Sequence, residues 1–584
     1  MHIHTYVHTY IHTVSSLFSY HTELVRVLSN TCVNNVLLSS SSYLCTNQRS
    51  LFNTMIIFFI WLVVLIAALA LHLRQMHSAF SKHGIKYLNP APLLGNMINT
   101  IFLREHFAYD VLRLYGSFPK DRFVGRYEFT NKAIMLRDLD LVKKITVKDF
   151  EVFLDHRDFG GDTFFGRTLI LMRGQEWKDM RSTLSPAFTS SKIRLMVPFM
   201  VEVGDQMIQS LNKEIEKSSD GYIDVDCKDL TTRYANDVIA SCAFGLKVNS
   251  HAEKNNEFYI MGRTAANFGL REMFMFIFMV IAPKIVALLK WNLVPDKMKN
   301  YFTNLVLDTM KDRELRHIFR PDMIHLLMEA KKGQLTHEDA KSNNDTTGFA
   351  TVEESTVGLK KTTNRVWNDN DLSAQAFLFF IAGFETVSTS MSFLLYELAV
   401  NPDVQERLAQ EIKEHDVKHG GKFDFNSIQN MKYMDMVVSE LLRLWPPLTV
   451  MDRECNRDYN MGKPNEDFDK DYILPKGTTV FIPTFAFHRD PQYFPDPEKF
   501  DPERFSEENR HKLNLNAYMP FGVGPRNCIG SRFALCELKV LTYQILLHME
   551  LSPSEKTQIP ARLAPDNINV RLQGGHWLRF RQRK

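Results

Sequence analysis

The longest uninterrupted apolar segment of the chain lies near its N-terminus. Residues 55–71 carry no charged or strongly polar side chain, and His72 and Leu73 extend the run. A helix that spans a bilayer needs roughly 17–25 apolar residues, so we expect residues 55–73 to form a transmembrane anchor. The alternative is a cleaved signal peptide, but its apolar run is usually about 7–15 residues, followed by a small-residue cleavage site that residues 74–76 do not provide.

Beyond this segment, apolar residues recur mainly at the spacing of an amphipathic helix. Strand-like runs are few and short, around 122–136, at Ile473 with 478–482, and at 568–580. The pattern therefore predicts a mainly α fold with a minor β-sheet. The segments with helical spacing are 176–188, 196–218, 228–243, 255–290, 299–333, 371–400, 403–415 and 427–445.

The length of 584 residues would by itself suggest two to four domains, at roughly 100–200 residues each. Residues 337–368, rich in Asn, Thr, Asp, Glu and Ser, are predicted to form a long surface loop. Since candidate functional residues lie on both sides of this loop, we expect one large domain over 96–584. Residues 74–95, which contain basic and proline residues, are predicted to form a hinge, and residues 1–54 are interpreted as a gene-model extension ahead of Met55.

Composition and charge exclude several classes of protein. Lys plus Arg number 70 and Asp plus Glu number 67, a net charge of +3 that is too even for a general nucleic-acid binder. Seven cysteines over this length do not make a secreted disulfide framework. Arg74, Lys82 and Lys86 follow the apolar run and only Arg49 lies close before it, so the positive-inside rule predicts that the bulk of the chain faces the cytosol.

One cysteine has a distinctive setting. Cys528 lies in Phe-Gly-Val-Gly-Pro-Arg-Asn-Cys-Ile-Gly, residues 521–530, a glycine-rich loop that leads into a helical segment. Glycines let the backbone approach a ligand closely, and both Arg526 and the start of a helix favour a thiolate. A single thiolate with no second cysteine in its loop is a poor zinc site and a good axial ligand for iron.

This loop resembles the signature of the cytochromes P450, the haem-thiolate monooxygenases. Phe521, Gly524, Arg526, Cys528 and Gly530 match the pattern Phe-x-x-Gly-x-Arg-x-Cys-x-Gly. The resemblance implies that these residues surround haem b, and that the cysteine is the axial ligand of its iron. It also implies a single large, mainly α fold with a minor sheet, preceded by a membrane anchor helix.

Two charged motifs extend the resemblance. Glu440 and Arg443 are three residues apart and can pair on one helix face, although such a pair alone is a weak signal because surface salt bridges are common. Arg504 lies in the Pro-Glu-Arg-Phe segment 502–505. The resemblance implies that the three side chains form one buried structural network that holds the haem-binding core.

A third motif lies inside the predicted helix over 371–400. Glycine in a helix costs about 1 kcal/mol relative to alanine, so Gly383 should have a local purpose. The resemblance implies that Ala382 and Gly383 leave room for dioxygen over the iron, and that Glu385 and Thr386 relay protons to it. The alternative from the residues alone is an ordinary apolar helix whose threonine bonds back to a carbonyl.

Haem carries two propionates, which need cations. Trp177 and Arg181 are four residues apart and share a helix face, and they resemble the family's Trp-x-x-x-Arg, which meets a propionate. Arg526 and Arg453 match further propionate positions. For Arg453 the alternative is a solvated surface charge.

The resemblance covers about residue 55 to the C-terminus, and its details are similar to insect microsomal members of the detoxification type, near family nine. It implies a monooxygenase that inserts one atom of O2 into lipophilic substrates, either xenobiotics or endogenous lipids and hormones. NADPH would supply electrons through a flavoprotein reductase, with cytochrome b5 as an optional partner and no role for nucleic acid. The implied location is the endoplasmic reticulum membrane, with a single-pass anchor and a cytosolic catalytic domain.

Two other functions remain open on the sequence alone. One is a haem-thiolate isomerase or dehydratase that acts on hydroperoxides without a reductase, and the other is a non-catalytic haem or lipid carrier. We expect electron donors to dock on the cysteine side, at positive charges from Lys178, Arg526 and Arg532. The apolar run over 274–281 is expected either to dip into the membrane or to pack inside the fold. Eight side chains are candidates for either pocket walls or core: Phe153, Phe164, Phe165, Phe379, Phe380, Phe384, Leu448 and Val450.

Overall fold

The computed structural model describes residues 41–158, 163–266, 270–289, 291–320, 322–332, 349–350, 365–566 and 569–584. Most of the predicted loop over 337–368, except residues 349–350 and 365–368, and most of the doubtful leader over 1–54 therefore lie outside the described residues. The chain divides into two compact units, residues 1–76 and 77–584.

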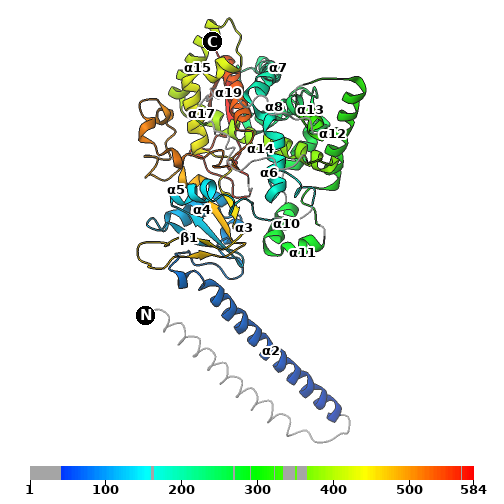
Figure 1. Ribbon diagram of the computed structural model, residues 1–584, viewed down its shortest axis with the longest axis vertical. Coiled ribbons are helices and arrows are strands. Elements are labelled where there is room, and N and C mark those ends of the chain that lie inside the picture. The colour runs from blue at the N-terminus through cyan, green and yellow to red at the C-terminus, as the bar shows by residue number, and fades with distance from the viewer. Residues whose placement is uncertain are drawn as a thin grey trace. The chain divides into compact units, whose positions relative to one another are not determined.

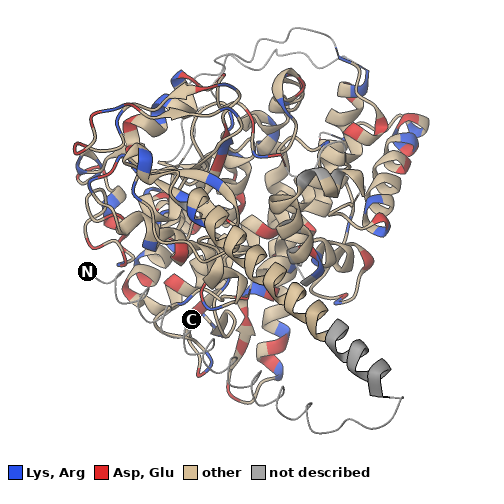
Figure 2. Ribbon diagram, turned by 90° about the horizontal axis from the view of Figure 1, so that it is seen from below, with Lys and Arg blue, Asp and Glu red and all other residues tan. Residues whose placement is uncertain are grey.

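The described part of the first unit forms one long helix, α2 (Ser41–His77). Its side chains from residue 52 to residue 72 are exposed, and Figure 2 shows an uninterrupted run of uncharged residues along it. The helical segment Phe52–His83 is long and apolar enough to cross a membrane, and a window of 18 residues within it has a mean hydropathy of 2.9. The predicted anchor is thus confirmed as a helix, and α2 begins before residue 55 and continues past residue 73.

The second unit is mainly helical with a few short strands, which confirms the predicted fold class. Its longer helices are α4 (Phe107–Gly116), α6 (Gly174–Leu184), α7 (Ser190–Lys217), α8 (Cys227–Ile239), α9 (Glu257–Ala266), α10 (Leu270–Ile281), α12 (Asp296–Arg316), α13 (Met323–Lys331), α14 (Asp369–Val400), α15 (Pro402–Lys418), α17 (Lys432–Leu444) and α19 (Ser531–His548). The shorter helices are α3 (Ile98–Ile101), α5 (Leu139–Lys143), α11 (Pro283–Leu288), α16 (Phe425–Gln429) and α18 (Thr484–Phe487).

The strands form three separate sheets. The largest has the order β1-β2-β7-β4, in which β2 and β7 are parallel and the other neighbours antiparallel, and it lies at the opposite end of the unit from α15 (Figure 1). The second sheet has the order β3-β9-β8, and the third pairs β5 with β6. The bounds are β1 (Phe123–Glu128), β2 (Asn131–Leu136), β3 (Tyr222–Asp226), β4 (Met451–Glu454), β5 (Tyr459–Asn460), β6 (Ile473–Leu474), β7 (Thr479–Ile482), β8 (Met549–Pro553) and β9 (Trp577–Gln582).

Some predicted segments are divided in the structure. The segment over 255–290 contains α9, α10 and α11, and Pro283 begins the last of them because proline has no amide with which to continue a helix. The segment over 299–333 is likewise two helices, α12 and α13. The strand predicted over 568–580 forms only from Trp577 onward. Periodicity identified the helices well, but tertiary contacts decided where they end.

Helix α14 runs through the middle of the helical part and packs against α8, α12 and α19 (Figure 1). Asn368 and Asp371 begin it with a capping box, in which each side chain accepts from the other residue's amide. The helix is apolar enough to span a membrane, but 61% of its apolar window is buried, as expected for a core helix. Gly383 allows α8 to approach closely, because a Cβ atom there would lie 2.1 Å from Cδ1 of Ile239.

Gly383→Ala should destabilise the protein, although alanine is the better helix former by about 1 kcal/mol. The added methyl group meets Ile239, and overpacking a core costs about 1–3 kcal/mol. Ile239→Val removes the Cδ1 atom, so in that background the same alanine should be neutral or stabilising. Urea unfolding of the four chains measures this, and a cost that Ile239→Val leaves unchanged would contradict the close contact.

Candidate functional site

The loop that carries Cys528 is held in shape by its own backbone. The Cys528 amide donates to the Phe521 carbonyl at 2.8 Å, and the Asn527 amide donates to the Gly524 carbonyl at 2.9 Å. Gly524 has φ +77°, and a Cβ atom there would lie only 2.0 Å from the carbonyl oxygen of Thr146. Glycine is therefore required at this position, both for the backbone conformation and for the close approach.

The thiol of Cys528 is accessible and forms no disulfide. Burial nevertheless raises the pKa of this thiol, and the Gly530 amide and the Arg181 charge oppose the rise. An accessible side chain in a buried environment lies on the wall of an internal space. A thiolate at this place needs a further positive charge, such as a bound iron. Among the described residues no group of three or more His, Cys, Asp or Glu side chains could hold a metal ion, which fits a single axial ligand.

Two arginines join this loop to the elements around it. Arg181, on α6, donates to the backbone and side-chain oxygens of Asn527, both at 2.8 Å. The guanidinium of Arg526 lies 4.0 Å from the ring centre of Trp177. Arg526 also donates to the backbone carbonyls of Leu154, Leu169 and Met172. Arg181 is therefore the arginine whose charge lowers the pKa of the thiol. The sequence suggested this effect for Arg526, which instead attaches the loop to neighbouring backbone.

Two buried arginines of the site each have a carboxylate close by. Arg453 is only 2% exposed, so its reading as a solvated surface charge is wrong. Burial lowers the pKa of Arg453 despite Asp452. Burial and the charge of Arg453 lower the pKa of Arg526, although Asp155 opposes this from 3.5 Å. An anionic ligand would add to the counter-charge that Asp452 and Asp155 already supply, so the residues fit the propionates of a haem.

Sequence reasoning missed a polar pair beside these arginines. Nδ1 of His156 lies 3.0 Å from Oδ1 of Asp452, and the Arg157 amide donates to the other carboxylate oxygen at 2.8 Å. Burial lowers the pKa of His156, and the charges of Arg453 and Arg526 lower it further. In the sequence, this residue could have been found from its position, because His156 is a titratable residue next to Arg157 in a segment similar to the family. Its ring thus lies within the influence of two arginines that the sequence assigned to propionates.

At residues 382–386, the predicted dioxygen motif, one face of helix α14 is exposed and another contacts side chains from distant parts of the chain. Ala382 and Thr386 are exposed one turn apart, and the Thr386 hydroxyl donates to the Ala382 carbonyl at 2.5 Å. Gly383 instead faces Ile239 of α8. The space beside its α-carbon is thus filled by a side chain, contrary to the expectation that it is left for dioxygen. Glu385 also points away from Thr386, toward Lys228 and Arg571.

The structure brings Glu440, Arg443 and Arg504 together. Arg443 binds both carboxylate oxygens of Glu440, at 2.7 and 2.9 Å, and both side chains are 0% exposed. Arg504 adds a contact of 3.3 Å to the same carboxylate. Arg443 also donates to the His488 carbonyl at 2.7 Å. The segment around His488 is thereby attached to α17.

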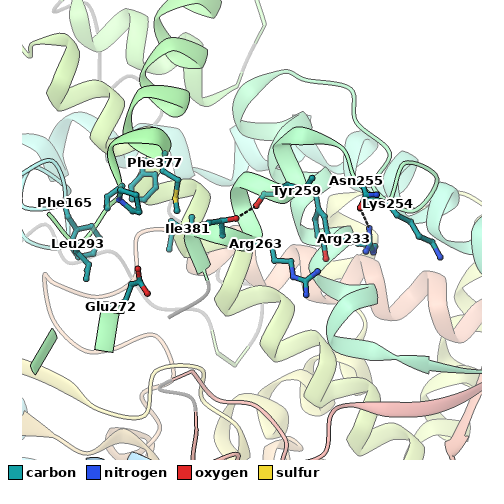
Figure 3. A pocket seen from close by; sticks show the side chains of 16 residues that line it. Phe165, Arg233, Lys254, Asn255, Tyr259, Arg263, Glu272, Leu293, Phe377 and Ile381 are labelled. Atoms are coloured by element: carbon teal, nitrogen blue, oxygen red, sulfur yellow. Dashed lines mark hydrogen bonds between the residues drawn. The ribbon is translucent and has the colours of Figure 1, made fainter. Parts of the chain in front are cut away.

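A cavity of about 480 Å³ lies between α9, α14 and the residues that precede α12 (Figure 3). Phe165, Leu293 and Phe377 lie at one end together with Glu272, and the other end contains Tyr259 and Arg233. Of the eight side chains that the sequence left between pocket and core, Phe165 lines this cavity. Phe153, Phe164, Phe380 and Phe384 are buried in the core.

Two of the basic side chains expected to bind an electron donor are buried or paired within the protein. The side chain of Arg526 is 4% exposed, so it offers no charge to a partner's surface. Lys178 is paired with Glu151 at 2.7 Å. A docking surface built on these two residues is therefore not supported by the structure.

Comparisons with known proteins agree on one family. The family model described as Cytochrome P450 matches residues 86–573. Cytochrome P450 9e2 of Blattella germanica is 42% identical over 87% of this chain and 94% of its own length. Probable cytochrome P450 9f2 of Drosophila melanogaster is 40% identical over 86% of this chain and 95% of its own length. Probable cytochrome P450 6g2 of the same fly is 34% identical over 89% of this chain and 98% of its own length. The predicted resemblance to family nine is confirmed.

Glu440→Gln should cost about 3–5 kcal/mol of stability, because it leaves two arginines buried without their shared counter-charge. The matched control is Glu507→Gln, which breaks the exposed pair of Glu507 with Lys432, also on α17. That change should leave the unfolding midpoint in place. Equal midpoint shifts for the two variants would show that burial does not strengthen the Glu440 network.

Proposed function

Because the chain belongs to the cytochrome P450 family and is a haem monooxygenase of the insect detoxification type, we propose that it is a membrane-anchored enzyme that oxidises lipophilic substrates. In this proposal one atom of O2 enters the substrate, and NADPH supplies electrons through a flavoprotein reductase. The observation that carries the proposal is the free, accessible thiol of Cys528 beside three buried guanidinium groups. Bound haem would supply the iron at which dioxygen is activated.

The residues of the site divide the work of holding the haem. Cys528 would be the axial ligand of the iron, and the Gly530 amide and Arg181 would help to stabilise its negative charge. Gly524 keeps the loop against Thr146, so that the thiol stays in place. The propionates would be bound by Trp177, Arg181, Arg453 and Arg526, with His156 beside them.

The other side of the haem would be formed by α14. Ala382 is small and exposed, and it leaves space next to the Thr386 hydroxyl. That hydroxyl can pass its own proton on and take another, so Thr386 is proposed as the last group of a proton relay. The end of the cavity around Phe165 and Phe377 suits lipophilic substrates, either xenobiotics or endogenous lipids and hormones.

Two apolar surfaces support attachment to a membrane. Helix α2 has the length and composition of a single-pass anchor. In the second unit, one apolar face of α10 and α11, which includes Met279, is buried, and another apolar face is exposed. Its exposed side chains are Phe274, Phe278, Ile281, Ile285 and Leu288. We place the protein in the endoplasmic reticulum membrane with its catalytic domain in the cytosol, where the reductase and cytochrome b5 could reach it.

The reduced, carbon-monoxide-treated protein should show the red-shifted Soret band of thiolate-ligated haem. Cys528→Ser should lose that band, because it removes the only proposed thiolate ligand. Cys536→Ser, a change at a buried cysteine of α19, is the control and should keep it. A histidine-type spectrum, or a thiolate band that survives Cys528→Ser, would contradict the proposal.

Product formation from a lipophilic alkoxycoumarin should require both NADPH and the reductase. The physical reason is that activation of dioxygen consumes two electrons, which in this proposal come from NADPH through the reductase. Conversion of a fatty-acid hydroperoxide with neither present would instead favour a hydroperoxide isomerase. Haem binding without turnover of either substrate would favour a carrier.

A further inference from the structure

Residues 163–172, the wall segment, form a series of turns beside the cavity rather than a helix or strand. Phe165 of this segment lines the cavity at the same end as Phe377 of α14 (Figure 3). Leu169 and Met172 are only 5% and 2% exposed. Because buried backbone groups in such a segment have no helix or sheet partners, they must be paired with groups from other elements.

One side chain of α14 supplies two of these partners. Gln375 is 0% exposed. Its Oε1 atom accepts from the Leu169 amide at 2.8 Å, and its Nε2 atom donates to the Arg167 carbonyl at 2.7 Å. Nε2 also donates to the Asp371 carbonyl at 3.0 Å, within α14. Both hydrogens of the Gln375 amide group are thus used, and the reversed orientation would set its oxygen against two carbonyls.

The wall segment has two further attachments. Nε of Arg167 donates to Oδ1 of Asp371 at 2.7 Å, and its terminal nitrogens bind both carboxylate oxygens of Glu176 on α6, at 3.1 and 3.0 Å. Arg526, from the loop of Cys528, donates to the Leu169 carbonyl at 3.1 Å. Leu169 is therefore held through its amide by α14 and through its carbonyl by the loop that carries the thiol.

We propose that Gln375 is a positioning residue that sets which lipophilic substrates the cavity accepts, because it fixes the wall segment and with it the ring of Phe165. The inference rests on the proposed function, and it adds a determinant of substrate length. The bonds of Gln375 go to backbone groups, so they fix the path of the chain whatever side chains the wall segment carries.

The position of the Phe165 ring follows from that path. The Phe165 carbonyl accepts from the Thr168 amide at 3.1 Å and from the Thr168 hydroxyl at 2.6 Å. Thr168 is 0% exposed and lies between Arg167 and Leu169, the two residues that Gln375 binds. A displacement of these two residues from α14 therefore also moves Phe165 at the wall of the cavity.

The first test measures how the cavity distinguishes a short substrate from a long one. Gln375→Met keeps the length of the side chain but removes all its hydrogen bonds, which leaves the Leu169 amide and the Arg167 carbonyl unpaired. The affinity for pentoxycoumarin relative to methoxycoumarin should rise about three- to tenfold, because the released Phe165 ring can yield to the longer chain. The spectral change that each coumarin causes at the haem gives both dissociation constants.

The matched control is a second buried glutamine with the same pattern of bonds. Gln405 of α15 is 3% exposed. It donates to the carbonyls of Leu398 and Leu551 at 2.8 and 2.9 Å and accepts from the Leu551 amide at 2.9 Å. Gln405→Met should lower the unfolding midpoint as Gln375→Met does, but it should leave the relative affinity for the two coumarins unchanged.

A second measurement needs neither substrate nor turnover. Hydrogen exchange of backbone amides, followed by mass spectrometry on the full chain, reports local opening. Gln375→Met should speed exchange in peptides that cover the wall segment, since the Leu169 amide loses its acceptor. Gln405→Met should instead speed exchange around Leu551. Unchanged exchange of the wall segment in Gln375→Met would show that Gln375 does not fix it.

A double-variant cycle tests whether Gln375 acts through Phe165. Phe165→Ala removes the ring whose place is at issue. If the proposal holds, Gln375→Met added to Phe165→Ala should cause no further change in relative affinity, whereas independent effects would add. Additive changes would overturn the proposed route through the Phe165 ring.

The outcomes separate this inference from the proposed function. A parent protein without a thiolate haem band or NADPH-driven product overturns the proposed function itself. A competent parent whose relative affinity is unchanged in Gln375→Met overturns the positioning role, even if the wall segment exchanges faster. If Gln375→Met does not fold, Gln375→Asn decides by the same measurements, because its amide is one methylene too short to reach the wall segment.

Discussion

Positive charge buried inside the protein is the constraint on which the functional site depends. Arg181, Arg453 and Arg526 are buried around the loop of Cys528, and burial lowers the pKa of the latter two arginines. Such charge is costly unless an anion joins it. A dianionic ligand that also carries a metal for the thiol satisfies both demands, which is why these residues form a site only together.

The second determinant is the packing of α14 against α8. At Gly383 the space between the helices is filled by the side chain of Ile239, whose Cδ1 atom would lie 2.1 Å from an added Cβ. Thr386 and Ala382 then face the exposed side, and Glu385 faces Lys228. Within one motif, two residues are thus accessible to a ligand and a third is held by ion pairs.

Much of the architecture followed from pattern. The anchor segment, the predominance of helix and the long helix over 371–400 were predicted correctly, because apolar periodicity reports directly on burial. The ends of helices and the pairing of strands were not, since Pro283 and contacts between distant segments decide them. The strands β6 and β7 lie within ten residues of each other, yet they belong to different sheets, and no local pattern separates them.

The sequence by itself determined the family, the single cysteine suited to haem iron and the arginines that a buried network requires. These are local signatures, in which spacing along a loop or helix fixes the geometry. Only the tertiary structure decided that Arg526 donates to backbone carbonyls, that His156 pairs with Asp452, and that Glu385 is held by Lys228 and Arg571. Those partners are far apart along the chain, and the direction of a side chain depends on helix rotation and on charges that only folding brings near.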